Sequence, residues 1–180
     1  MLQIEVPEQE FWNETLGEFV KSKPKTLQLE HSLVSISKWE STWKKPFLSK
    51  EEKTYEETID YVRCMTITQN VDPNTYLALT PENIEQVNAY ISDSMTATFF
   101  SGREPGRGSG KVVTSELIYY WMVALNIPFE CQKWHLNRLL TLIKVCNLES
   151  APPKKRSKRD VMAQNKALNA ARRKRLGSRG

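Results

Sequence analysis

The sequence lacks the hydrophobic segments that would carry the chain into or across a membrane. None of its apolar runs reaches the length of about eighteen residues that a transmembrane helix requires. The N-terminal stretch MLQIEVPEQE is acidic, whereas a secretory signal begins with a basic stretch followed by an apolar one. These absences predict a soluble, cytosolic protein that has no membrane partner.

Cysteine is scarce, and its three copies, Cys64, Cys131 and Cys146, are odd in number and lie among Met, Leu and Val. A disulfide framework needs paired cysteines and an oxidising compartment. We therefore expect buried free thiols in a reducing compartment.

Histidine occurs only twice, which limits metal and acid–base chemistry. Cys131 and His135 are four residues apart, a spacing that would place them on one face of a helix, but a zinc site needs three or four ligands. His31 has no Cys or His close to it in the sequence, so a buried thiol and a hydrogen-bonded histidine explain the pair better. A Cys–His nucleophile pair would need an exposed thiolate, and these residues lie among leucines. We expect a protein that is not an enzyme and that binds neither metal nor cofactor.

A phosphate-binding loop is also missing from the glycine-rich segment SGREPGRGSGK, residues 101–111. A P-loop needs Gly, four further residues and then Gly-Lys-Ser/Thr, so that backbone N–H groups surround the phosphates. Pro105 stands where the first Gly is required, and Val112 replaces the Ser or Thr. We interpret residues 101–111 as a flexible polar linker.

What the sequence does contain, at its start, is the alternation typical of β-strands. In LQIEV, residues 2–6, apolar and polar side chains alternate, and residues 26–30, TLQLE, repeat the pattern. Between them, aromatic residues on both sides of a polar turn predict a hairpin over residues 11–20. The sequence therefore predicts a small antiparallel β meander or hairpin within residues 1–31.

From Ser32 onward the apolar period changes to that of helices. The expected helices span residues 32–45, 54–67, 80–91, 115–125 and 130–148. The first three begin with residues that cap helices well, Ser32, Thr54 and Thr80. The sequence thus predicts an α+β, mainly α, fold in which residues 1–150 form one globular domain, with residues 32–150 as its helical part.

Charge is distributed unevenly along the chain. Residues 151–180 hold eleven Lys and Arg against one acid, a net charge of +10, so the first 150 residues carry −5 of the total of +5. We interpret this basic C-terminal arm as a segment that folds into a helix when it binds a polyanion or a protein. A solvated tail that binds no ligand is a further interpretation. The residues expected to make its contacts are Lys154, Lys155, Arg156, Lys158, Arg159, Arg172, Arg173, Lys174 and Arg175.

Three long stretches of the sequence are distinctive: LEHSLVSISKWESTWKKPFLS, IYYWMVALNIPFECQKWHLNRLLTLIKVCN and NKALNAARRKRLGSRG. In these stretches the chain resembles a family of small proteins encoded among the tail genes of tailed bacteriophages and prophages, similar to tail assembly chaperones. The resemblance covers nearly the whole chain. It implies a non-enzymatic protein of the bacterial host cytoplasm that coats the tape measure protein, or another tail protein, and is commonly made in a short and a frameshifted longer form.

A chaperone of this kind needs an apolar groove between helices, and the chain has more aromatic side chains than one helical stripe can bury. The candidates for such a groove are Trp39, Trp43, Tyr119, Tyr120 and Trp134. A tryptophan-rich core is the simpler interpretation of the same residues.

The alternative function is a nucleic-acid-associated virion or head–tail component whose basic arm binds DNA without sequence specificity. Salt distinguishes the two functions, because binding through phosphates weakens steeply with salt and apolar burial does not. The sequence leaves the oligomeric state open, a homo-oligomer included.

Overall fold

The computed structural model of the chain describes residues 1–13, 17–100, 112–150 and 158–177. Its elements are β1 (Leu2–Val6), β2 (Gln9–Asn13), β3 (Glu18–Ser22), β4 (Lys25–Leu29), α1 (Leu33–Trp43), α2 (Tyr55–Met65), α3 (Pro73–Leu77), α4 (Pro81–Ser92), α5 (Ser115–Ala124), the 3₁₀ helix η1 (Phe129–Lys133), α6 (Leu136–Glu149) and α7 (Lys158–Leu176). The predicted α+β, mainly helical fold is confirmed. Among these described helices, none combines the length and the apolar character needed to cross a membrane.

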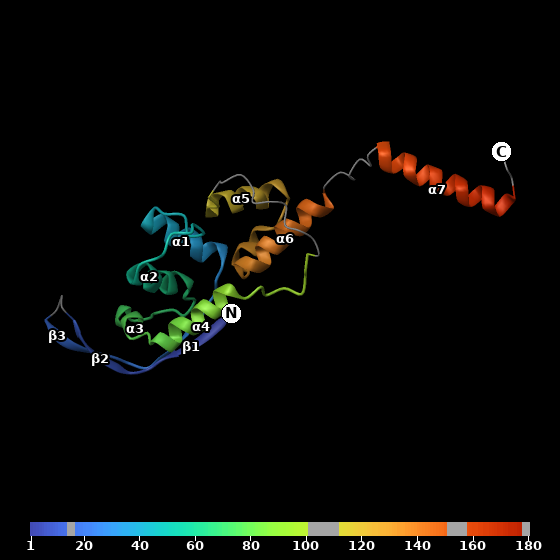
Figure 1. Cartoon of the computed structure of the whole chain (residues 1–180). Helices are drawn as coiled ribbons and strands as arrows, with labels where there is room; N and C mark the ends of the chain where they lie inside the picture. Colours follow the sequence, from blue (N-terminus) through green and yellow to red (C-terminus); the bar gives the residue numbers. More distant parts are fainter. Residues whose placement is uncertain (14–16, 101–111, 151–157, 178–180) are drawn as a thin grey trace. The chain divides into compact units, whose positions relative to one another are not determined.

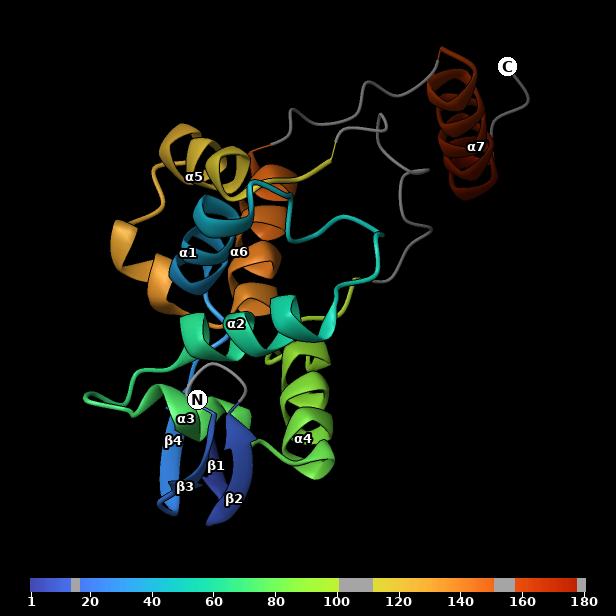
Figure 2. The same cartoon turned by 90° about the vertical axis from the view of Figure 1, so that its left-hand side faces the viewer.

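The chain divides into two compact units, Met1–Asn147 and Leu148–Gly180. In the first unit the strands lie at one end, with α2, α3 and α4 beside them, and α1, α5 and α6 form the opposite end (Figures 1 and 2). The second unit contains the helix α7.

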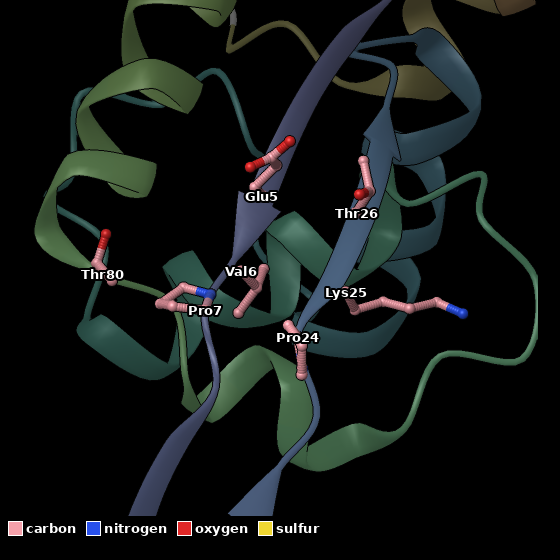
Figure 3. Close-up of a pocket in the computed structure, with 7 residues that line it drawn as sticks. All are labelled: Glu5, Val6, Pro7, Pro24, Lys25, Thr26 and Thr80. Carbon is pink, nitrogen blue, oxygen red and sulfur yellow. The ribbon is translucent and has the colours of Figure 1, made fainter.

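The four strands form one long antiparallel hairpin in two segments rather than a meander. β1 pairs with β4 and β2 pairs with β3 in one continuous register, in which the numbers of opposed residues always add up to 31. By the same count Pro7 faces Pro24, and Figure 3 shows the two prolines on adjacent strands where the segments meet. Proline has no backbone N–H, so neither residue can donate to the ladder. A hollow of about 410 Å³ lies at this break, with Thr80 at its edge.

The core lies between the β1–β4 segment and the helices packed against it. Strand alternation turns every second residue of β1 and β4 inward, and each helix contributes residues at three- and four-residue spacing. The fully buried apolar residues include Ile4, Leu27, Leu29, Leu33, Ile36, Trp39, Val62, Met65, Ile118, Met122, Leu136 and Leu139.

The predicted helix starts at Ser32, Thr54 and Thr80 are confirmed. Each side chain accepts a hydrogen bond from the backbone N–H three residues later, in a reciprocal capping box. The short helix α3 was not predicted, because five residues are too few to show a helical period. Its start nevertheless carries a local signal, since Asp72 caps it and Pro73 occupies its first position.

The prediction of one helix over residues 130–148 is wrong for about the first third of that range. Residues Phe129–Lys133 form the 3₁₀ helix η1, Trp134 is extended, and α6 begins only at Leu136. His135 forms a bridge with Ser32, and its Nδ1 accepts a hydrogen bond from the Asn137 N–H at 3.3 Å, which stands in for a cap. Cys131 and His135 therefore do not share a helical face.

A buried carboxylate fixes the start of α5. Glu40, near the end of α1, accepts one hydrogen bond from the Phe47 N–H and another from the Ser115 N–H, each at 2.8 Å. Thr114, at the N-cap position of α5, makes no side-chain capping bond, so Glu40 satisfies the helix start from another element. A carboxylate at a helix N-terminus also interacts favourably with the helix dipole.

Replacement of Glu40 should therefore weaken the fold. In Glu40→Ala two buried N–H groups lose their acceptors, and we expect a loss of about 2–4 kcal/mol in the free energy of unfolding. Urea unfolding followed by circular dichroism measures it. The exposed Glu56→Ala is the control and should change stability by less than about 0.5 kcal/mol. Equal stabilities of the two variants would show that the Glu40 bridge contributes nothing.

Candidate protein-binding surfaces

The five aromatic residues predicted to bind a partner do not lie in one groove. Trp39 is buried, and its Nε1–H donates to the Glu57 carbonyl at 2.9 Å. Trp43 stacks on Trp39 with ring centroids 6.2 Å apart, and its Nε1–H donates to Asp60 Oδ2 at 2.9 Å. These two tryptophans connect α1 to α2 through hydrogen bonds and packing. They therefore belong to the tryptophan-rich core and not to a free binding surface.

Trp134 is half-buried beside a separate hollow of about 270 Å³. The Arg138 guanidinium lies over the Trp134 ring, 4.4 Å from its centroid, as in a cation–π contact. Glu30 and Lys133 line the same hollow, so its surroundings are strongly polar. Trp134 is therefore not part of a wide apolar surface.

Tyr119 and Tyr120 do belong to an exposed apolar surface on α5 and η1. They are joined by Val123, one turn further along α5, and by Phe129 of η1, whose ring centroid lies 6.4 Å from that of Tyr119. Tyr120, Val123 and Phe129 are 65%, 60% and 55% exposed, and Tyr119 is half-buried, with its hydroxyl donating to Gln132 Oε1 at 2.8 Å. We call Tyr119, Tyr120, Val123 and Phe129 the aromatic face.

The aromatic face is exposed because α5 buries only a narrow stripe. Ser115, Ile118 and Met122 are the fully buried residues of this helix. Helical spacing in SELIYYWMVAL, residues 115–125, predicts a different buried face, through Leu117, Ile118, Trp121, Ala124 and Leu125. Of these only Ile118 is fully buried, and Ala124 is exposed. A helix this apolar with so narrow a buried stripe leaves large side chains in solvent.

A second apolar surface, which the sequence did not predict, lies between α2 and α3. Tyr55 and Ile59 of α2 face Pro73, Tyr76 and Leu77 of α3 across a groove of about 240 Å³. The charged residues on its rim are Glu56, Asp60 and Arg63. We call this set of eight residues the α2–α3 groove. The spacing of Tyr55 and Ile59, one turn apart along α2, is the sequence signal that could have indicated it.

The fold brings together two histidines that are far apart in the sequence. The ring centroids of His31 and His135 lie 5.1 Å apart, and both side chains are buried. His31 Nδ1 is hydrogen-bonded to the Tyr61 hydroxyl, and His135 Nε2 donates to the Tyr90 carbonyl at 3.0 Å. Across residues 1–13, 17–100, 112–150 and 158–177, no group of three or more His, Cys, Asp or Glu is placed to hold a metal ion. The pair joins the end of β4 to α2, α4 and the start of α6.

Cys64, near the end of α2, has a partly buried thiol. Burial, with a smaller effect of the nearby Asp60 carboxylate, raises the pKa of this thiol to about 11. The thiol is therefore protonated at neutral pH and is a weak nucleophile.

The basic arm is described only in its helical part. Lys154, Lys155, Arg156 and the expected Ser157 cap, like the linker at residues 101–111, lie outside the described residues. Within α7, Arg159 and the cluster Arg172–Arg175 are exposed. Arg159, Lys166 and Arg173 recur every seven residues, which places them along one side of the helix.

Acidification should destabilise the fold through His31. Burial, with a smaller effect of His135, lowers the pKa of His31 to about 3, whereas an unfolded histidine has a pKa of about 6.5. Between these values the unfolded chain binds more protons than the folded one, so the stability present at neutral pH is lost as pH falls. We expect the protonation of His31 in the unfolded chain to lower the free energy of unfolding by about 1.4 kcal/mol for each pH unit below about 6.

Urea unfolding at several pH values between about 7 and 5 measures this loss, in a range above the usual pKa values of the carboxylates. The variant His31→Gln should show a shallower pH dependence than the natural chain, whatever its stability at neutral pH. Parallel pH profiles for the two proteins would exclude His31 as the source.

Comparison with known proteins adds no family to these observations. No known protein family matches the chain, and no match was found among curated proteins or solved structures. The resemblance to tail assembly chaperones consequently stays a prediction, and the aromatic face and the α2–α3 groove are the surfaces that bear on function.

Proposed function

We propose that this chain is a non-enzymatic tail assembly chaperone that binds the tape measure protein of a tailed bacteriophage in the cytoplasm of the bacterial host. The observation that supports the proposal best is the aromatic face, where three large apolar side chains of α5 and η1 are more than half exposed. Contiguous exposed apolar surface of this kind marks protein-binding sites on soluble proteins. The resemblance of the sequence to phage tail-gene proteins supplies the identity of the client.

The chemistry of the aromatic face suits a helical client. A tape measure protein is long and largely helical, and its apolar stripes would aggregate if they stayed in water. Tyrosine and phenylalanine bury a large area with few rotatable bonds, so Tyr119, Tyr120 and Phe129 can cover such a stripe at a low entropic cost. Because the contact is apolar, it persists when salt screens charges.

Loss of two side chains of the aromatic face should strongly lower recovery of the client. The variant Tyr120→Ser/Val123→Ser removes two exposed apolar side chains. We expect at least a tenfold drop in the soluble tape measure protein that co-purifies after nuclease treatment and a high-salt wash. A tenfold drop corresponds to a loss of about 1.4 kcal/mol in binding free energy. The measurement is co-expression with the tape measure protein of the same gene cluster, followed by affinity purification.

The matched control is Ile67→Ser, which removes an equally exposed apolar side chain, 52% exposed, outside both apolar surfaces. It should recover the client like the natural chain. The proposal would be contradicted if the double variant recovered as much tape measure protein as the natural chain. It would also be contradicted if neither the natural chain nor its variants recovered any tape measure protein.

A second candidate function, nucleic-acid association in a virion or head–tail component, is favoured by α7. The line formed by Arg159, Lys166 and Arg173 offers repeated positive charge to a phosphate backbone, and Arg172, Lys174 and Arg175 extend the charge to the other sides of the helix. Contacts of this kind bind without base specificity, because they reach phosphates and not base edges.

Salt dependence tests this candidate. If α7 binds duplex DNA, the triple variant Arg159→Gln/Lys166→Gln/Arg173→Gln should lower the slope of log affinity against log salt by about three, one for each lost phosphate contact. Fluorescence anisotropy of a labelled duplex between about 50 and 200 mM salt measures the slope. An affinity for DNA that the triple variant retains in full would exclude this line of charges as the binding site.

A further inference from the structure

The α2–α3 groove has apolar walls that nothing in the described part of the first unit covers. Tyr55 and Leu77, on its two sides, are 65% and 51% exposed. α2 and α3 pack directly against each other in both views (Figures 1 and 2), so the walls are held by the fold and not by a loop. A preformed apolar groove of about 240 Å³ has room for one bulky side chain or two smaller ones.

The cations around the start of α2 are already committed to other groups. Lys45 Nζ pairs with Glu57 at 2.6 Å, and Lys53 Nζ donates to the Phe47 carbonyl at 2.8 Å. On the rim itself, Arg63 pairs with Asp60 at 2.6 Å. These three basic residues are thus occupied by groups of the chain itself.

One acid that lines the groove, Glu56, has its carboxylate in solvent. Glu51, Glu52 and Glu56 are exposed, and none of them takes part in a salt bridge within the described residues. Glu56 lies on the rim, next to Tyr55, and Glu51 and Glu52 shortly precede α2. The groove therefore combines an apolar interior with one carboxylate on its rim, that of Glu56, which has no salt bridge in the part of the chain that the structure describes.

From this combination we infer that the α2–α3 groove is a docking site for a cationic amphipathic segment of a partner protein. The segment inserts a bulky apolar side chain between Ile59 and Leu77, and it places a Lys or Arg beside Glu56. A neutral segment with the same apolar side chain lacks this second contact, and an acidic segment is in addition repelled by the Glu56 carboxylate. The site shares no residue with the aromatic face, so it goes beyond the proposed function and does not depend on it.

Two synthetic amphipathic peptides test the inference, one built from leucine and lysine and the other from leucine and glutamate with the leucines at the same positions. Titration of the ¹⁵N-labelled full chain, followed by NMR, reports both the affinity and the amides that shift. We expect the lysine peptide to bind at least about tenfold more tightly than the glutamate peptide and to shift the amides of Tyr55, Ile59 and Leu77.

Variants separate the two components of the site. Leu77→Ser should weaken the lysine peptide about tenfold, and Glu52→Gln/Glu56→Gln should weaken it several-fold at low salt and have little effect at high salt. Ile67→Ser is the matched control and should bind like the natural chain. Each replaced side chain is exposed, so the fold is expected to persist, and circular dichroism verifies it.

Three results would overturn the inference: equal affinity for the two peptides, shifts confined to residues outside the groove, or undiminished binding by Leu77→Ser. The outcome is separable from that of the proposed function. Tyr120→Ser/Val123→Ser should bind the lysine peptide normally, and Leu77→Ser should recover the tape measure protein normally.

Discussion

The buried carboxylate of Glu40 is the constraint on which the helical end of the first unit depends. It replaces the missing side-chain cap of α5 and also closes the loop that follows α1. Because the two N–H donors converge on one side chain, the start of α5 and the loop after α1 are both fixed to the end of α1. The aromatic face is thus placed by a residue of α1 that lies 75 positions before the start of α5.

The two apolar surfaces arise from different packing conditions. α5 is apolar around most of its circumference but buries a narrow stripe, which leaves Tyr120 and Val123 in solvent. α2 is amphipathic and packs on the core and on α3 at once, so the edge between its two contacts becomes a groove. Sequence reasoning reached Tyr119 and Tyr120 from the abundance of aromatic residues. It could not separate them from Trp39, because exposure depends on neighbours that no local pattern reveals.

Local signals made much of the fold predictable. The caps at Ser32, Thr54 and Thr80 act within three residues of their own positions, and strand alternation is equally local, so these elements can be read from the sequence. The interruption before α6 has a distant cause, since His135 pairs there with Ser32. An apolar period continues across such a break, and a prediction based on the period therefore joins η1 and α6 into one helix.

The paired prolines of the hairpin have a consequence for how this sequence can change. Across Pro7 and Pro24 the two ladders keep one register only because both strands have the same number of residues there. The insertion of a single residue on one side of the break would make that strand one residue longer than its partner, so that a bulge forms or the pairing of Trp12 with Phe19 shifts by one position. Length changes in this stretch are therefore tolerated in matched pairs, one on each strand.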